Sequence, residues 1–219
     1  MTLTNRRRGP DAGTAKQAVV FLHGYGADGN DLIGLADPLA PHLPDTAFHS
    51  PDAPEPCRAS PMGRQWFPIP WLDGASEAEM GTSFARSTEE LNRFLDGVLA
   101  DEGLTADRLV LVGFSQGTMM SLHVAPRRAA PVAGVVAFSG RLLVPERLET
   151  EVVSRPPVCL IHGDADEVVP FADMGQAATA LQGAGFTVAG HVMRGTGHGI
   201  APDGLSVALG FIRSCLSLD

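Results

Sequence analysis

The sequence predicts an α/β protein with a mainly parallel central sheet and helices on both faces. Short apolar runs alternate along the chain with longer amphipathic stretches, which is the order that β-α-β units produce. Several of these runs are unbroken, such as Leu109-Val110-Leu111-Val112, and such strands are typical of a parallel sheet covered on both faces. The predicted strands are residues 18–23, 46–50, 108–113, 132–138, 158–162 and 187–193.

Between the strands, apolar residues recur at helical spacing. In the segment 82–100, a stripe of Phe84, Leu91 and Leu95 faces one way while Glu and Arg occupy the other sides. The predicted helices are residues 82–100, 116–125, 171–183 and 204–216.

The chain of 219 residues is expected to form a single domain. Residues 1–17 are short and polar, with arginine at positions 6–8, and are expected to be a mobile or loosely attached N-terminus. Residues 51–81 are rich in proline and contain both Trp66 and Trp71, so an ordered excursion near the active site is expected there. The same aromatic side chains are suited to a homodimer interface, which makes a homodimer possible.

Composition argues against several classes of partner. The formal net charge of −9 is the wrong sign for binding nucleic acid, and no apolar stretch is long enough to span a membrane. We therefore expect no nucleic-acid partner and no stable membrane association. The three cysteines are too scattered for a disulfide framework and have no zinc-ligand spacing, so we expect a cytoplasmic protein without metal or cofactor.

The candidate nucleophile is Ser115, in Gly113-Phe114-Ser115-Gln116-Gly117. A predicted buried strand leads directly into this G-x-S-x-G motif and a predicted helix leads directly out, which is the setting of a nucleophile elbow. By itself the motif is also compatible with an ordinary glycine-rich helix start in which Ser115 is the N-cap.

A serine hydroxyl needs an adjacent base, and the candidates follow later strands. The strand 158–162 is followed by three acidic residues, Asp164, Asp166 and Glu167, and the next strand by the glycine-flanked His198. The order serine, acid, histidine is the one found with this type of elbow. We favour Asp166 as the acid because it lies further along the loop, whereas Asp164 follows a glycine and is placed to close a turn.

Acyl transfer also needs N–H donors for the oxyanion. The first candidate is the backbone N–H of Gln116, directly after the nucleophile, and the second is that of Tyr25, in the loop His23-Gly24-Tyr25-Gly26 after the strand 18–23. The alternative for this loop is a plain glycine-rich turn between a strand and a helix.

Taken together, these segments resemble the α/β-hydrolase family of carboxylesterases, lysophospholipases and acyl-protein thioesterases. The matching stretches are Phe21-Leu22-His23-Gly24-Tyr25-Gly26, Gln65-Trp66-Phe67, Gly113-Phe114-Ser115-Gln116-Gly117, His162-Gly163-Asp164-Ala165-Asp166-Glu167-Val168-Val169-Pro170 and Gly197-His198. The resemblance implies a minimal hydrolase without a large lid, a triad of Ser115, Asp166 and His198, and Trp66 near the acyl pocket.

The sequence thus favours a serine carboxylesterase that hydrolyses small-molecule esters with short to medium acyl chains through an acyl-enzyme. An acyl-protein thioesterase or a lysophospholipase with the same triad is the alternative within enzymes. A catalytically silent binding protein with a hydrolase fold is the alternative of another class.

Overall fold

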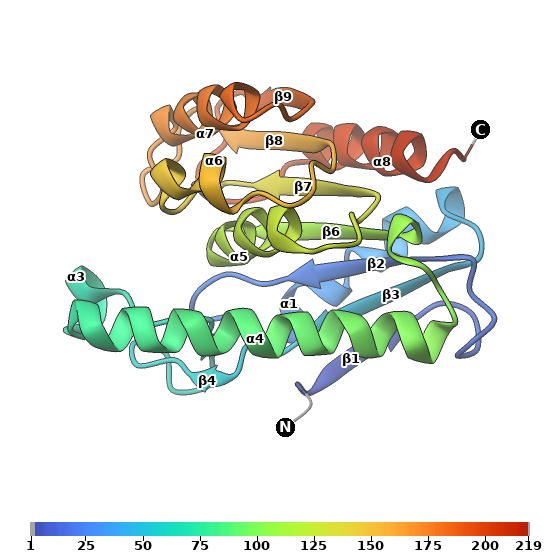
Figure 1. The fold of residues 1–219 in the computed structure, drawn as a ribbon, viewed down its shortest axis with the longest axis horizontal. Coiled ribbons are helices and arrows are strands. Elements are labelled where there is room, and N and C mark those ends of the chain that lie inside the picture. Colours follow the sequence, from blue (N-terminus) through green and yellow to red (C-terminus); the bar gives the residue numbers. More distant parts are fainter. Residues whose placement is uncertain (1–2, 219) are drawn as a thin grey trace.

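Seven strands form the central sheet of the computed structural model, which describes residues 3–218 (Figure 1). Their order across the sheet is β1-β3-β2-β6-β7-β8-β9, and only β1 runs antiparallel to its neighbour. The strands are β1 (Asn5–Arg8), β2 (Gln17–Leu22), β3 (Thr46–Pro51), β6 (Leu109–Phe114), β7 (Gly134–Phe138), β8 (Val158–Gly163) and β9 (Val188–Met193). The six predicted strands correspond to β2, β3 and β6 to β9.

The two faces of the sheet carry separate hydrophobic cores. Alternate residues of each strand point to opposite faces, so in β2 Val20 and Leu22 enter one core while Val19 and Phe21 enter the other. Helices α4, α5 and α7 cover the first face, and α1 and α8 cover the second (Figure 1). The α-helices are α1 (Gly29–Ile33), α2 (Ala36–Leu39), α3 (Pro70–Asp73), α4 (Glu77–Glu102), α5 (Gln116–Val124), α6 (Leu148–Glu151), α7 (Ala172–Gly183) and α8 (Pro202–Leu216). Single turns of 3-10 helix lie at Ala40–His42, Ala106–Arg108, Ala125–Arg127 and Pro145–Arg147.

Helix α4 begins at Glu77, five residues before the predicted start at position 82. A capping box accounts for the difference: the Ser76 hydroxyl accepts the backbone N–H of Glu79, and the Glu79 carboxylate accepts that of Ser76. The apolar stripe begins later than this cap because the first turns of α4 extend beyond the core. That projecting end of α4 forms one wall of a groove beside Ser115.

Within the N-terminal segment that was expected to be mobile or loosely attached, residues 5–8 form the edge strand β1. This strand pairs antiparallel with β3 along its whole length, from Asn5 beside Pro51 to Arg8 beside Phe48. The Arg7 guanidinium donates two hydrogen bonds, of 2.6 and 2.9 Å, to the buried carboxylate of Glu102 at the end of α4. A run of arginines looks solvated in sequence, and its acidic partners become visible only once the chain is folded.

The segment 51–81 has little regular structure but many fixed contacts. It contains a small antiparallel pair, β4 (Glu55–Pro56) and β5 (Arg64–Gln65), followed by the single helical turn α3. The N–H of Gly26, in the loop after β2, donates to the Arg64 carbonyl at 2.9 Å. A Cβ on Gly63 would lie 2.0 Å from the Gly26 carbonyl oxygen, so the two loops are in direct backbone contact. The segment is thereby held over the carboxyl ends of β2 and β6.

Candidate active site

Ser115 lies on a strained turn between β6 and α5. Its backbone adopts φ 53° and ψ −115°, a conformation that a non-glycine residue rarely holds. A Cβ on Gly117 would lie 1.8 Å from the Leu22 carbonyl oxygen, and one on Gly113 would lie 2.5 Å from the Thr118 nitrogen. Both glycines of the motif are therefore required for the turn to pack against β2 and α5.

The alternative role of Ser115 as a helix cap does not hold. Its side chain makes no capping hydrogen bond to α5. Its backbone N–H donates to the Phe138 carbonyl at 2.9 Å, so the neighbouring strand β7 fixes the turn. Within the described part of the chain the Ser115 hydroxyl makes no hydrogen bond at all, which leaves it available to a base or a substrate.

Asp166 and His198 are brought together from the loops after β8 and β9. His198 Nδ1 lies 2.8 Å from Asp166 Oδ2, and Asp166 Oδ1 accepts the backbone N–H groups of Val168 and Val169, both at 2.9 Å. Asp164 instead accepts the backbone N–H of Gly195 at 2.6 Å. Asp164 thus holds the loop before His198, while Asp166 contacts the imidazole itself.

The environment of Asp166 favours its charged form. Burial by itself would raise the pKa of this carboxyl, but the hydrogen bonds from His198 and from the two backbone N–H groups outweigh it, and the pKa is lowered. The His198 ring packs against Phe114, with ring centroids 4.8 Å apart. An ionised carboxylate that fixes Nδ1 leaves Nε2 of His198 free to exchange a proton with the nucleophile.

The loop after β2 lies directly against the nucleophile. A Cβ on Gly24 would meet the Ser115 Cβ at 3.3 Å, so the backbone of Tyr25 passes within reach of a group bound to Ser115. The Tyr25 hydroxyl donates to Asp73 at 2.8 Å, which ties this loop to α3. Gln116 is the first residue of α5, where the backbone N–H has no acceptor within the helix. The Gln116 N–H thus follows the serine directly, and the loop that carries Tyr25 lies against it.

The Trp66 side chain, predicted to lie near the acyl pocket and to bind substrate, is fully buried and is absent from the lining of the groove. The Trp66 indole N–H donates to the His23 carbonyl at 3.0 Å, and the next residue, Phe67, reaches the groove instead. The Gln116 side chain clamps this segment, since its Oε1 accepts the Trp66 N–H at 2.8 Å and its Nε2 donates to the Phe67 carbonyl at 2.7 Å.

His23 supports the loop after β2 through hydrogen bonds, a role that the sequence did not indicate. It is completely buried, its Nδ1 lies 2.8 Å from the Gly24 carbonyl oxygen, and its Nε2 accepts the backbone N–H of Ala53 at 3.0 Å. Burial lowers the pKa of His23, so the ring is neutral and can donate at one nitrogen while accepting at the other. The sequence placed His23 at the start of the predicted oxyanion loop, after a buried strand, but did not indicate this supporting role.

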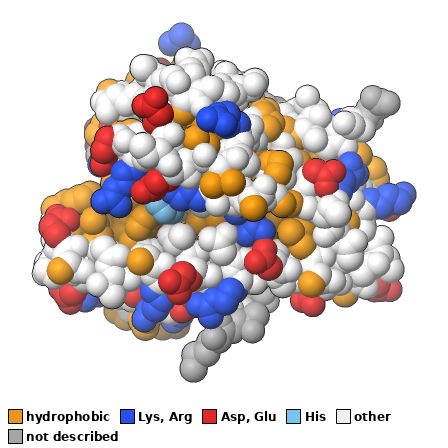
Figure 2. Space-filling model, in the orientation of Figure 1, with side chains coloured by type: hydrophobic (Ala, Val, Ile, Leu, Met, Phe, Trp, Pro, Cys, Tyr) orange, Lys and Arg blue, Asp and Glu red, His pale blue; other side chains and the backbone are white. Residues whose placement is uncertain are grey.

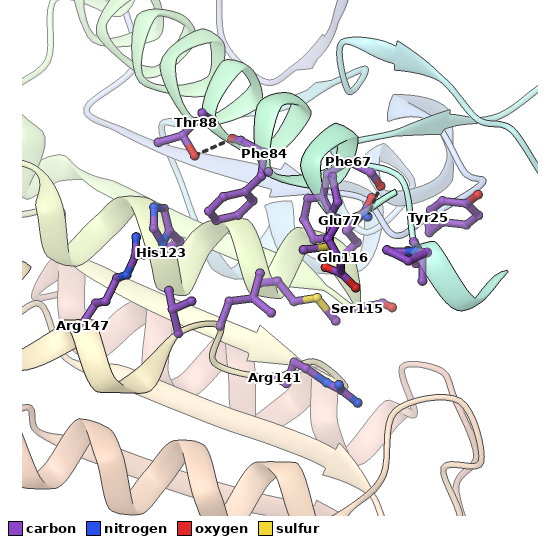
Figure 3. A pocket seen from close by; sticks show the side chains of 18 of the residues that line it. Tyr25, Phe67, Glu77, Phe84, Thr88, Ser115, Gln116, His123, Arg141 and Arg147 are labelled. Atoms are coloured by element: carbon purple, nitrogen blue, oxygen red, sulfur yellow. Dashed lines mark hydrogen bonds between the residues drawn. The ribbon is translucent and has the colours of Figure 1, made fainter. Parts of the chain in front are cut away.

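A groove of about 820 Å³ opens beside Ser115. It follows one face of α5, through Gln116, Met119 and His123, and its opposite wall is the projecting start of α4 with Met80 and Phe84 (Figure 3). Figure 2 shows it as a hollow with hydrophobic side chains on its walls and a histidine on its floor. The lining includes the serine and, from the loop that carries Asp166, Val168 and Val169, but not His198.

The residues that the structure describes contain no cluster of three or more His, Cys, Asp or Glu side chains suited to hold a metal ion. Within the same residues no helix is long and apolar enough to cross a membrane.

Comparison with known proteins identifies the family. The profile described as Phospholipase/Carboxylesterase matches residues 10–216. The chain belongs to this family. Its fold is therefore the α/β-hydrolase fold, without a large lid among the described residues, and it is an ester-hydrolysing enzyme. The resemblance seen in the sequence is confirmed.

Curated relatives of this member of the phospholipase/carboxylesterase family are named either acyl-protein thioesterases or esterases. It is 26% identical to acyl-protein thioesterase 1 of Gibberella zeae, over 94% of both chains, and 28% identical to the esterase YpfH of Escherichia coli, over 91% of this chain and 83% of that one. Among solved structures, esterase PE8 is 40% identical, with a TM-score of 0.92 over 99% of this chain and 100% of that one.

Proposed function

We propose that the protein is a serine carboxylesterase for esters with short to medium acyl chains, with Ser115, His198 and Asp166 as its triad. The observation that carries this proposal is the Asp166–His198 hydrogen bond at the mouth of an apolar groove that begins at Ser115. His198 takes the proton of Ser115, whose oxygen attacks the acyl carbon, and the N–H groups of Tyr25 and Gln116 receive the oxyanion. His198 then protonates the leaving alcohol, and water releases the acid from the acyl-enzyme.

We infer from the position of His198 which half of the ester occupies the groove. The general acid has to lie next to the leaving group, and His198 stands outside the groove lining with its side chain partly exposed. The leaving alcohol or thiol accordingly departs toward solvent. The acyl chain lies along α5, between Met119 and Phe84.

A second candidate function is an acyl-protein thioesterase. The solvent-facing leaving-group side accepts a large thiol as readily as a small alcohol, and one relative at 26% identity is named acyl-protein thioesterase 1. The chemistry at Ser115 is the same in both cases.

A chain-length series tests the proposal. We expect kcat/KM for p-nitrophenyl esters to rise from acetate to octanoate, because each methylene buried against the groove walls contributes about 0.8 kcal/mol. No further rise is expected for palmitate, because the far end of the groove is ionic. A fluorophosphonate probe should label Ser115; folded protein without this label would be the silent binding protein instead.

The leaving group is tested separately with octanoyl ester and octanoyl thioester of matched alcohol and thiol. A preference for the ester supports the carboxylesterase, and a preference for the thioester, most of all when it is carried on a peptide, supports the thioesterase.

We also propose a cytoplasmic location. Cys57, Cys159 and Cys215 are all free thiols, two of them buried, as expected of a chain kept in a reducing compartment.

A further inference from the structure

The end of the groove farthest from Ser115 is polar, unlike its walls. Six side chains surround it, contributed by α4, by α5 with the turn that follows, and by the segment around α6. They are Thr88, Glu89, His123, Arg127, Arg147 and Glu151.

Most of these groups already have partners within the protein. Arg127 donates to the Glu151 carboxylate at 2.7 and 2.8 Å and to the His123 carbonyl at 2.8 Å. Glu89 lies 3.9 Å from Arg93, which stands outside the groove. The Thr88 hydroxyl donates to a carbonyl of its own helix at 2.9 Å. Each carboxylate at this end is therefore matched by an arginine.

Arg147 and His123 are the exceptions. The Arg147 guanidinium makes no hydrogen bond or ion pair with the described residues; Glu151 feels its field, but the Glu151 oxygen Oε2 is taken by Arg127. His123 Nδ1 is buried without a hydrogen-bond partner in the same part of the chain. Figure 3 shows the Arg147 side chain extending toward the His123 imidazole. At this end of the groove, one guanidinium and one imidazole nitrogen are thus without a partner among the described residues.

The field around His123 is consistent with an excess of positive charge. Its pKa is lowered to about 4, by burial first and then by Arg127; the opposing effect of Glu151 is next in size, and Arg147 lowers the pKa by less. The ring packs on Phe84, with centroids 4.5 Å apart, and is neutral at physiological pH. A neutral imidazole can donate one N–H to an anion while Arg147 supplies the charge.

We propose that Arg147 and His123 form a subsite for a carboxylate at the far end of the acyl chain, so that preferred substrates are half-esters or half-thioesters of medium-chain dicarboxylic acids. This inference rests on the proposed function, in which the acyl chain occupies the groove. His123 lies eight positions after Ser115 along α5, about 12 Å at 1.5 Å per residue, a span suited to a medium-length chain. The methyl end of an unsubstituted acyl chain would remove water from the Arg147 guanidinium without offering it a hydrogen bond, which is unfavourable.

The test compares two p-nitrophenyl esters of equal chain length, the octanoate and the half-ester of suberic acid, in wild type, Arg147→Ala and His123→Phe. We expect Arg147→Ala to lower the ratio of kcat/KM for the half-suberate to kcat/KM for the octanoate about fivefold, the effect of a partly exposed ion pair. His123→Phe should likewise lower this ratio. Added salt should weaken the half-suberate preference of the wild type. Arg155→Ala, at an exposed arginine away from the groove, is the matched control.

Equal effects of Arg147→Ala on both esters, or an equal effect of Arg155→Ala, would overturn the subsite and leave the esterase standing. Failure of every variant and of the wild type to hydrolyse either ester would instead overturn the proposed function.

A binding measurement reads the subsite without turnover. In the Ser115→Ala background, suberate should raise the melting temperature more than octanoate does, and the difference should vanish in Ser115→Ala/Arg147→Ala. Equal protection by the two acids, or protection that survives loss of Arg147, contradicts the subsite.

Discussion

The two ends of the groove are built on opposite principles. At the reacting end, each group is held by buried partners: Asp166 by two backbone N–H groups, His198 by Asp166, and the turn at Ser115 by β7. At the far end, Arg147 is exposed and unpaired among the described residues, and His123 keeps an unsatisfied nitrogen.

This difference teaches where the protein tolerates change. Catalysis requires donors and acceptors placed before the substrate arrives, and such preorganisation needs rigid backbone and buried support. Selection of an acyl chain depends on contacts that form only with the bound ligand. Changes at the reacting end should therefore abolish turnover for every substrate, while changes toward the far end should redistribute activity among substrates.

The largest expected effect is that of Ser115→Ala. Loss of the nucleophile should lower kcat by about 10⁶-fold for all esters alike, because a catalytic unit of this kind fails as a whole. Steady-state kinetics on acetate and octanoate esters measures it, with Ser206→Ala on the exposed face of α8 as control. Residual activity that differs between the two esters would contradict the uniform loss.

Replacing the acid distinguishes the two aspartates. Asp166→Asn should lower kcat by about 10⁴-fold, as loss of the carboxylate leaves the imidazole in the wrong tautomer. Asp164→Asn should cost far less, because among the described residues that carboxylate accepts the Gly195 N–H and lies 3.9 Å from the Arg194 guanidinium, but contacts neither His198 nor Ser115. The reverse order of effects would move the acid role to Asp164.

The packing of the elbow can be broken without touching a reacting group. Gly117→Ala places a methyl group 1.8 Å from the Leu22 carbonyl oxygen, and we expect the free energy of unfolding to fall by about 3 kcal/mol. Gly97→Ala, in the middle of α4 with open space around its Cβ position, should raise it by about 0.5–1 kcal/mol. Urea unfolding of the two variants checks the pair; similar values would mean that the turn relaxes.

The charge of Asp166 should also affect the free energy of unfolding and its dependence on pH. Its pKa is lowered in the folded protein, so its charged form stabilises the fold above the unfolded carboxyl pKa of about 3.9, and this contribution is lost as pH falls through the folded pKa. Asp166→Asn should thus lower the free energy of unfolding by about 1–2 kcal/mol at pH 7. The gap to wild type should close below the ordinary carboxyl range, as urea unfolding from pH 7 to pH 3 can show.

A modest effect that depends on the substrate is expected in the middle of the groove. Met119→Trp should fill the space beside Phe84 and lower kcat/KM for the octanoate ester about tenfold, with little change for acetate. Met119→Leu, which nearly conserves volume, should leave both unchanged. An equal loss for the two esters would mean that Met119 acts at the reacting end of the groove. The distinction between the two ends would then not hold at this residue.

Much of the fold could be predicted because the local signals agreed. The strand 108–113, the glycines around Ser115 and the helix that follows are written in consecutive residues, and β6 and α5 form where their patterns indicate. The apolar stripe predicted that α4 starts at position 82, later than its true start. The capping box formed by Ser76 and Glu79 marks where the helix begins.

Other features depend on residues far apart in the chain. The partner of Arg7 is Glu102, 95 positions away, and no local pattern shows that this pair ties β1 to the end of α4. The family resemblance implied that Trp66 lies near the acyl pocket. Whether it or Phe67 faces the groove depends on which way the chain is clamped by Gln116.

The sequence by itself determined the class of the fold, the order of the candidate triad along the chain and the turn at Ser115, because each depends on a few adjacent residues. Only the tertiary structure decided that Asp166 rather than Asp164 meets His198, and that Met119, His123 and Arg147 line one groove. Loops from different strands converge at the carboxyl edge of a parallel sheet, but a difference of two residues within one loop changes which side chain points across that edge. That geometry is set by packing between distant segments, so it had to be seen in three dimensions.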